Sequence, residues 1–270
     1  MSIFQKAAIT LPFLAAGALV TGAAQAATGV PLLQDDFSGS SADEKLWHIP
    51  TWTSPTDGTY IGRTQFRVTQ DSGLPATADG SLVIPIETHN PKQTSFLAAE
   101  VISNQEFSVG TGLDIVIRAK MNAPLRPGVV GGLFLYALQA GSDTIHDEID
   151  FELLTNKPDQ VQTNIYGHEP LGIGHVEFIP YQTGSMTDFH NYEIKWTPKL
   201  VSWLIDGKLV RTTTSNIPAA PMRFYVNAWA PDEHWPQAYS ATIQPTASAD
   251  ANEMVGAVHV DSITIRPLTP

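Results

Sequence analysis

Short runs of alternating apolar and polar residues recur along most of this 270-residue chain. Successive side chains of a β-strand point to opposite faces, so an alternation of period two predicts strands with one buried face. Gly, Pro, Asn and Asp separate the runs, and no stretch has a convincing helical period over three turns. We expect strands at residues 81–87, 114–121, 129–138, 145–154, 160–167, 174–180, 190–196, 222–229 and 255–265.

The clearest local unit is LVSWLIDGKLVRTT, residues 200–213. Two alternating arms flank Asp206-Gly207, and Asp-Gly favours the positive φ angles of a tight hairpin turn. Many short strands joined by such turns predict an antiparallel β-sandwich or barrel. A sandwich of two sheets suits this length, and a curved outer face of one sheet can form a cleft.

The N-terminal segment has a different pattern. Lys6 precedes an apolar, Ala-rich stretch, and TGAAQAA then ends at small residues. This order is typical of a secretory signal peptide that is cleaved after Ala26. The alternative, a membrane anchor, is disfavoured because the apolar run is shorter than ~20 residues and contains Pro12. We expect residues 1–26 to be a signal peptide, residues 27–270 to form a single domain, and the protein to be secreted or periplasmic.

The net charge limits the classes of partner, and the cysteine content limits how the fold is stabilised. The formal net charge is −12, and nucleic acids or anionic membranes require clustered basic residues, so neither partner is expected. A neutral or cationic ligand suits this charge better. The chain contains no cysteine, so an exported fold must be held together by its core rather than by disulfides.

One predicted strand concentrates carboxylates. In HDEIDFELL, residues 146–154, Glu148, Asp150 and Glu152 share one face and the apolar residues between them share the other. The Cα atoms of Glu148 and Glu152 would be about 13 Å apart on a straight strand. On a concave sheet their carboxyl groups can approach the separation of about 5–5.5 Å that retaining glycoside hydrolysis requires. The charge of Asp150 would raise the pKa of its acidic neighbour.

Two other interpretations of this strand remain open. Alternation of this kind is also typical of a solvated sheet face. However, three carboxylates without an interleaved Lys or Arg are less ordinary, because like charges repel across a sheet. A calcium site is the second alternative, since hard cations bind carboxylate oxygens, although the intervening residues here are apolar.

HDEIDFELL resembles the active-site strand of glycoside hydrolase family 16, whose signature is Glu-x-Asp-x-Glu. A single residue, Phe151, separates Asp150 from Glu152, as in the unbulged branch that contains lichenases and xyloglucan endotransglycosylase/hydrolases. Other segments similar to the family are residues 98–121, 161–166, 188–211, 227–235 and 258–265.

The resemblance implies an all-β fold: a concanavalin A-like jelly-roll sandwich with a substrate cleft on its concave face. It implies that Glu148 is the nucleophile, Glu152 the general acid/base and Asp150 an assisting acid. The substrate contacts that it implies are Glu100, Gln162, Asn164, Trp229 and Trp235.

The alternation of side chains along the strands predicts that three further residues face the cleft. Tyr136 and Tyr166 alternate with apolar residues, and His146 shares the parity of the carboxylates. His146 can tune Glu148 or simply hydrogen-bond to it. Trp229 has a second interpretation, because a tryptophan in a strand is commonly buried in the core.

The implied activity is that of a secreted, endo-acting, retaining glycosidase that cleaves a β-glucan with 1,4 or mixed 1,3-1,4 linkages by double displacement. The alternatives are a transglycosylase acting on xyloglucan-like polymers and a non-catalytic carbohydrate-binding module. The expected partner is the polysaccharide, bound by a monomer. No cofactor is required, and the lichenase resemblance implies a structural calcium with Asp261 as the matching position.

Overall fold

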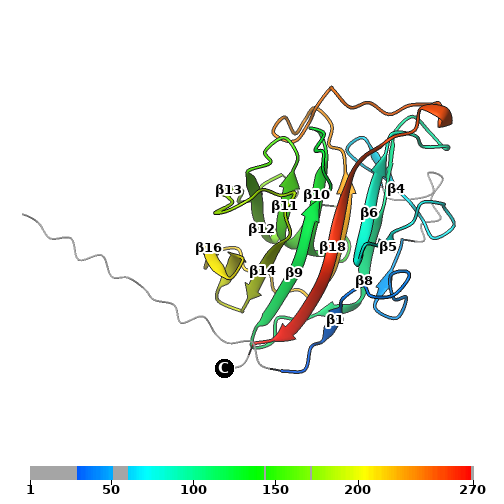
Figure 1. Cartoon of the computed structure of the whole chain (residues 1–270). Coiled ribbons are helices and arrows are strands. Elements are labelled where there is room, and N and C mark those ends of the chain that lie inside the picture. Colours follow the sequence, from blue (N-terminus) through cyan, green and yellow to red (C-terminus); the bar gives the residue numbers. More distant parts are fainter. Residues whose placement is uncertain (1–28, 51–59, 143, 171, 269–270) are drawn as a thin grey trace, which may run out of the picture.

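The computed structural model consists of two β-sheets packed face to face (Figure 1). It describes residues 29–50, 60–142, 144–170 and 172–268. The predicted signal peptide lies outside these ranges and stays a prediction. Within them there is one short 3-10 helix, η1 (Ala249–Ala251), and no helix is long and apolar enough to cross a membrane.

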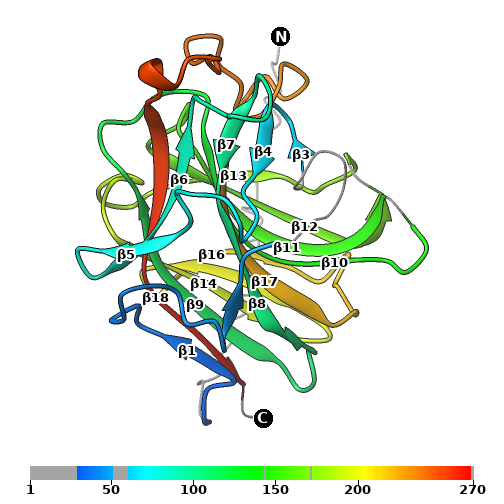
Figure 2. The ribbon, with the colours of Figure 1, turned by 90° about the vertical axis from the view of Figure 1, so that its right-hand side faces the viewer.

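The seven-stranded sheet contains the carboxylate motif. Its strands follow the order β13-β12-β11-β10-β17-β8-β2, and all neighbours are antiparallel. Strands β10, β11 and β12 bend along their length, which makes one face of this sheet concave (Figure 2). The strands are β2 (Trp47–His48), β8 (Glu100–Phe107), β10 (Val130–Leu138), β11 (Ile145–Leu154), β12 (Gln160–Pro170), β13 (Glu177–Pro180) and β17 (Met222–Trp229).

The eleven-stranded sheet forms the second layer. Its path is β16-β15-β14-β9-β18-β6-β7-β4-β3, with β1 paired to β18 and β5 paired to β6. Strand β18 lies between β9 and β6 (Figure 1). The strands are β1 (Leu33–Asp35), β3 (Tyr60–Ile61), β4 (Thr64–Phe66), β5 (Ala76–Ala78), β6 (Ser81–Glu87), β7 (Phe96–Ala98), β9 (Leu113–Met121), β14 (His190–Trp196), β15 (Val201–Ile205), β16 (Lys208–Thr213) and β18 (Met254–Pro267).

The alternating runs form strands close to their predicted positions. Strands β6, β11, β14 and β17 have the predicted bounds. Strand β13 begins at Glu177 rather than at residue 174, because the preceding residues line the cleft instead of pairing with β12. The predicted all-β jelly-roll sandwich is confirmed, and of the two architectures left open, the sandwich is correct.

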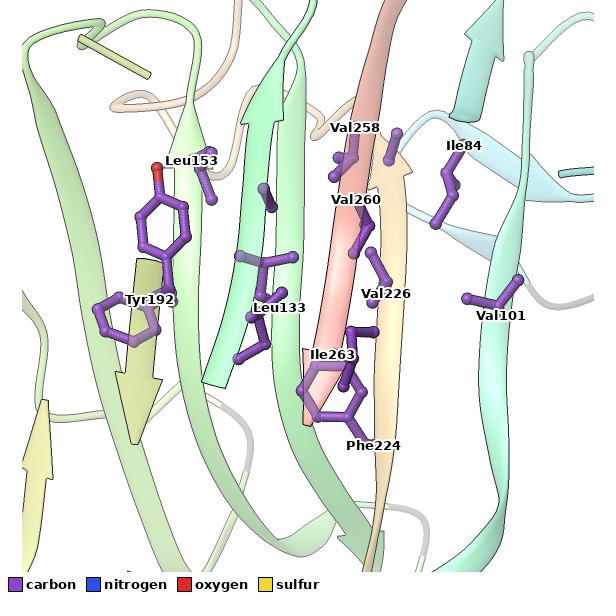
Figure 3. Packing of buried hydrophobic residues seen from close by; sticks show 14 of the residues in the cluster. Ile84, Val101, Leu133, Leu153, Tyr192, Phe224, Val226, Val258, Val260 and Ile263 are labelled. Atoms are coloured by element: carbon purple, nitrogen blue, oxygen red, sulfur yellow. The ribbon is translucent and has the colours of Figure 1, made fainter. Parts of the chain in front are cut away.

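The core lies between the two sheets. Leu133 and Phe224 from the seven-stranded sheet and Ile84 and Val260 from the other sheet are fully buried there (Figure 3). Burial of a side chain of this kind contributes roughly 1.5–3 kcal/mol to folding. The apolar residues of β11 join this core, so the opposite face of β11 is directed away from it.

The predicted hairpin joins β15 to β16. Asp206 and Gly207 both have positive φ angles, 51° and 74°, as a tight hairpin turn requires. The Asp206 carboxylate accepts hydrogen bonds from the backbone N–H of Asn191 at 2.9 Å, while its other oxygen lies 2.7 Å from His190 Nδ1. The turn is thereby tied to the first residues of β14.

Candidate active site

A cleft of about 460 Å³ opens on the concave face of the seven-stranded sheet. The three carboxylates of β11 form part of its lining. The complete lining consists of Glu148, Asp150, Glu152, Gln162, Asn164, Tyr166, Gly172, Gly174, Val176, Trp229, His234 and Trp235. The carboxylate face of β11 is therefore the floor of a concave site rather than a flat, solvated surface.

The strand that carries the carboxylates, β11, pairs regularly with β10 and β12 from Glu148 to Glu152. Asp150 lies opposite Phe134 of β10 and Asn164 of β12, and no register shift interrupts the pairing from Glu148 to Glu152. A shift against β12 occurs only between His146 and Glu148. Because the stretch of the motif has no bulge, its three acidic side chains point to the same side.

Glu152 has the protonation behaviour of a general acid. Burial, followed by the charge of Glu148, raises the pKa of Glu152 to about 8. The side-chain amide of Gln162 donates to Glu152 Oε2 and opposes this rise. The sequence predicted that the charge of Asp150 would raise this pKa, whereas in the structure the charge responsible is that of Glu148. Glu152 therefore retains its proton at neutral pH.

Asp150 is buried between its two acidic neighbours. Burial, then the charges of Glu152 and Glu148, raise the pKa of Asp150 well above its ordinary value, and Arg211 opposes the rise. Its Oδ1 atom is buried without a hydrogen-bond partner, and its backbone carbonyl accepts a hydrogen bond from Trp203 Nε1 at 3.0 Å. Three crowded carboxyl groups do not ionise together, so part of the group stays protonated.

His146 is fully buried beside Glu148. Its Nδ1 lies 3.0 Å from the carbonyl oxygen of Thr144, which can only accept, so Nδ1 donates. Its Nε2 lies 3.1 Å from Glu148 Oε2, an ion-pair distance without the alignment of a hydrogen bond. Burial alone would lower the pKa of His146, but Glu148 and the Thr144 carbonyl raise it overall.

A row of polar side chains crosses the sheet at the level of Glu152. Successive partners in the row are Gln162, Glu152, Gly132, Asn227 and Glu100, one from each of five neighbouring strands. The Asn227 amide donates to Glu100 Oε2 at 3.0 Å, and burial raises the pKa of Glu100 to about 7.

The same row contains two acceptors that no protein group satisfies. Asn227 Oδ1 and Gln162 Oε1 are both buried without a hydrogen-bond partner. They lie on opposite sides of Glu152 along the row. A ligand that carries many hydroxyl groups would satisfy such acceptors.

Aromatic rings line the cleft and continue beyond it. Trp229 stacks on Trp235, with ring centroids 5.5 Å apart, and both rings line the cleft. Trp229 also packs partly against the core, so both interpretations offered for this residue describe part of its surroundings. Tyr136 lies 5.3 Å from the ring of His146, which in turn lies 4.3 Å from the ring of Tyr166.

Five of the eight predicted substrate-contact residues line the cleft: Gln162, Asn164, Tyr166, Trp229 and Trp235. The other three are adjacent to the lining rather than in it. Tyr136 pairs with Glu148 across the β10–β11 ladder, His146 contacts Glu148, and Glu100 ends the polar row. Their roles as substrate contacts remain predictions.

Sequence reasoning missed several residues of the site. His234 and three residues of the loop after β12, Gly172, Gly174 and Val176, line the cleft, and Asn227 belongs to the polar row. A Cβ atom on Gly174 would lie 2.5 Å from Asn164 Nδ2 and from the Tyr166 hydroxyl. The two glycines of the GIGH stretch were the available signal for this close approach.

The predicted calcium position lies outside the cleft lining, on β18. Asp261 Oδ2 lies 3.3 Å from Arg118 Nε, so a guanidinium group already neutralises this carboxylate. No group of three or more His, Asp or Glu among the described residues is arranged to hold a metal ion. Calcium at Asp261 stays a prediction.

Comparison with known proteins identifies the family of the chain. A model described as "Glycosyl hydrolases family 16" matches residues 62–247, which include the carboxylate strand and most strands of both sheets. The chain belongs to glycosyl hydrolase family 16. It is therefore a glycosidase that acts on O-glycosyl bonds.

Relatives of this family 16 chain include bacterial enzymes. It is 29% identical over 197 residues to a beta-glucanase of Paenibacillus polymyxa, covering 72% of this chain and 77% of the relative. It is 27% identical over 212 residues to a beta-glucanase of Bacillus subtilis (strain 168), covering 78% and 79%. The solved structure of a prokaryotic beta-1,3-1,4-glucanase (lichenase) from a mouse hindgut metagenome has a TM-score of 0.66 and 23% identity. It covers 87% of this chain and 98% of that structure, a likeness that shows the fold.

Proposed function

We propose that this family 16 glycosidase is an exported, monomeric, endo-acting β-glucanase that cleaves 1,4 or mixed 1,3-1,4 linked glucans with retention of configuration. The observation that carries the proposal is the placement of Glu148, Asp150 and Glu152 together on the floor of one cleft. The Paenibacillus and Bacillus relatives are beta-glucanases. The proposal includes export directed by residues 1–26 and no required cofactor.

The first half of the reaction uses two carboxyl groups in opposite protonation states. Glu148, held beside the imidazole of His146, is ionised and attacks the anomeric carbon. Glu152 is protonated because its pKa is raised to about 8, and it donates its proton to the leaving glycosidic oxygen. The bond from sugar carbon to leaving oxygen breaks as the bond to Glu148 forms.

The second half reverses these roles. Glu152, now ionised, accepts a proton from a water molecule, whose oxygen attacks the anomeric carbon and releases Glu148. Two displacements at the same carbon restore the original anomeric configuration. Asp150 is buried between the two glutamates, and its protonation depends on whether these neighbours are ionised. Asp150 assists both steps in this way.

The cleft is suited to a sugar polymer. Gln162 lines the cleft beside Glu152, and its unsatisfied amide oxygen can accept a hydrogen bond from a sugar hydroxyl. The Trp229–Trp235 pair presents apolar ring surface for the faces of sugar rings. An open groove with binding groups on both sides of the acid supports cleavage within a chain rather than at its end.

A substrate panel tests the proposal. Purified protein is incubated with mixed-linkage glucan, xyloglucan, laminarin and a soluble cellulose derivative, with and without an oligosaccharide acceptor, and product size is followed. We expect rapid shortening of mixed-linkage glucan, no product extended by the acceptor, and initial release of the retained anomer in NMR spectra. An inverted product would contradict double displacement, and failure to cleave any β-glucan would overturn the proposal.

A further inference from the structure

A coil segment that follows β17 forms one wall of the cleft. Residues 230–243, which we call the tryptophan arm, contain no strand or helix. The arm carries His234 and Trp235 into the cleft lining. Backbone N–H groups satisfy the carbonyls of Asp232 and Trp235 within the arm. Because the arm lacks a strand neighbour, its other carbonyls need donors from elsewhere in the molecule, and these donors fix its course.

One arginine from the opposite sheet supplies most of these bonds. Arg63 lies in the turn between β3 and β4, outside the cleft lining. Its Nε donates to the Pro231 carbonyl at 3.0 Å, Nη2 to Ser240 at 3.1 Å and Nη1 to Ile243 at 3.2 Å. These carbonyls lie on both sides of Trp235 in the sequence, so a single guanidinium joins the two ends of the arm.

Further contacts fix the guanidinium itself. Its Cζ lies 4.7 Å from the ring centroid of Tyr239 in the arm and 5.2 Å from that of Phe96 in β7. The backbone N–H of Arg63 donates to the Ala230 carbonyl at 3.0 Å. A planar group with several donors in fixed directions suits three carbonyls and two rings, whereas a lysine ammonium cannot reproduce that geometry.

We propose that Arg63 is a positioning residue for substrate binding: it holds the tryptophan arm so that Trp235 stacks on Trp229 and completes the cleft wall. The carboxylates stand on β11, a separate element whose geometry is set by β10 and β12. Loss of Arg63 therefore weakens binding of the polymer and leaves the chemical step nearly intact. This role deepens the proposed function by assigning the residue that organises the aromatic subsite for glucan.

The experiment compares Arg63→Met and Arg63→Lys with Arg126→Met in the full chain. Arg126 is a matched control because its guanidinium also makes a hydrogen-bonded pair, but with Glu253 on the surface rather than with carbonyls of the arm. We expect KM for mixed-linkage glucan to rise about fivefold in both Arg63 variants, with kcat changed by less than about twofold. Exciton-coupled circular dichroism of the Trp229–Trp235 pair should weaken in these variants and stay unchanged in Arg126→Met.

A double-mutant cycle separates positioning from general stabilisation. In a Trp235→Ala background, Arg63→Lys should produce no further increase in KM, because Arg63 acts through that ring. An equal increase in both backgrounds would overturn the proposal, as would folded Arg63 variants with wild-type KM and an intact exciton signal. If the wild-type protein cleaves no glucan, the proposed function fails, yet the exciton signal still reports whether Arg63 positions Trp235.

Discussion

Strands β9 and β11 have the same alternation of buried apolar and outward polar residues, but their acidic residues have different charged neighbours. Each buries its apolar residues in the common core and directs acidic residues to the other face of its sheet. On β9, Asp114 is followed on the same parity by Arg118 and Lys120. On β11, the corresponding face carries acidic side chains at three successive positions, and the described lining of the cleft contains no lysine or arginine.

The pKa values of the buried acids on the two strands differ accordingly. Burial, followed by Glu193, raises the pKa of Asp114 to about 6, while Lys195 and Arg266 oppose the rise. Arg266 Nε lies 3.9 Å from Asp114 Oδ2, and Lys195 Nζ lies 3.1 Å from Glu193 Oε1. On β11 the pKa of the buried acid rises further, to about 8. The structural cluster thus pairs two acids with two cations, Lys195 and Arg266. In the cluster proposed to be catalytic, three acids are balanced only in part, by Arg211 near Asp150 and by the imidazole of His146.

The largest effect is expected when one acid is removed from each cluster, which tests this contrast directly. Glu148→Ala should lower kcat by about 10⁴-fold because no other group can form the glycosyl-enzyme, whereas Glu193→Ala on the other sheet should change kcat by less than about twofold. Circular dichroism checks that both variants fold. Azide should restore activity to Glu148→Ala by replacing the missing nucleophile. Full activity of Glu148→Ala without azide would disprove its assignment.

The second test concerns the proton on Glu152. Glu152→Gln should lower kcat on glucan by about 10³-fold, because the amide cannot protonate the leaving oxygen. The loss should be much smaller with an aryl glycoside whose phenol leaves without protonation. In the wild-type protein, activity should fall as pH rises through about 8, where Glu152 loses its proton. Equal losses on both substrates would contradict the role of general acid.

The motif strand was predictable because its information is local. A period of two fixes the face of each side chain on β11. The absence of a bulge and the cleft residues Gln162 and Asn164 were implied by the resemblance to family 16. Every one of these residues lies in a regular ladder.

The walls of the cleft were less predictable because long-range contacts position them. The tryptophan arm depends on Arg63, more than 160 residues earlier in the chain, as the hydrogen bond to Pro231 illustrates. The loop containing Gly174 follows the shapes of Asn164 and Tyr166 rather than a strand pattern. No hydrophobic period encodes such contacts, so His234 and Val176 emerged only from the structure.

A third test compares one histidine from each sheet. His146→Asn should lower kcat by about tenfold, because Glu148 loses the imidazole that lies 3.1 Å from its Oε2 atom and holds the carboxylate in place. KM should change by less than about twofold. His259→Asn, on β18 of the other sheet, should leave both quantities unchanged. An unchanged kcat in His146→Asn would show that this histidine does not position Glu148.

The smallest expected effect is on stability and comes from Asp114. Its pKa is raised in the folded protein, so the stability that this group contributes is present below 3.8 and is lost as pH rises through about 6. Asp114→Asn stays neutral throughout. The free energy of unfolding of the variant relative to the wild type should therefore increase across this interval by an amount on the order of 1 kcal/mol. Its relative Tm should rise with it and then level off.

The same titration on Glu152→Gln sharpens the contrast between the two strands. Because the raised pKa of Glu152 is about 8 and its ordinary value 4.5, the relative Tm of this variant should keep rising well above pH 6. Activity should be unchanged in Asp114→Asn and nearly abolished in Glu152→Gln. If both variants level off at the same pH, the two carboxylate clusters have the same electrostatic surroundings, and weaker charge compensation no longer distinguishes β11 from β9.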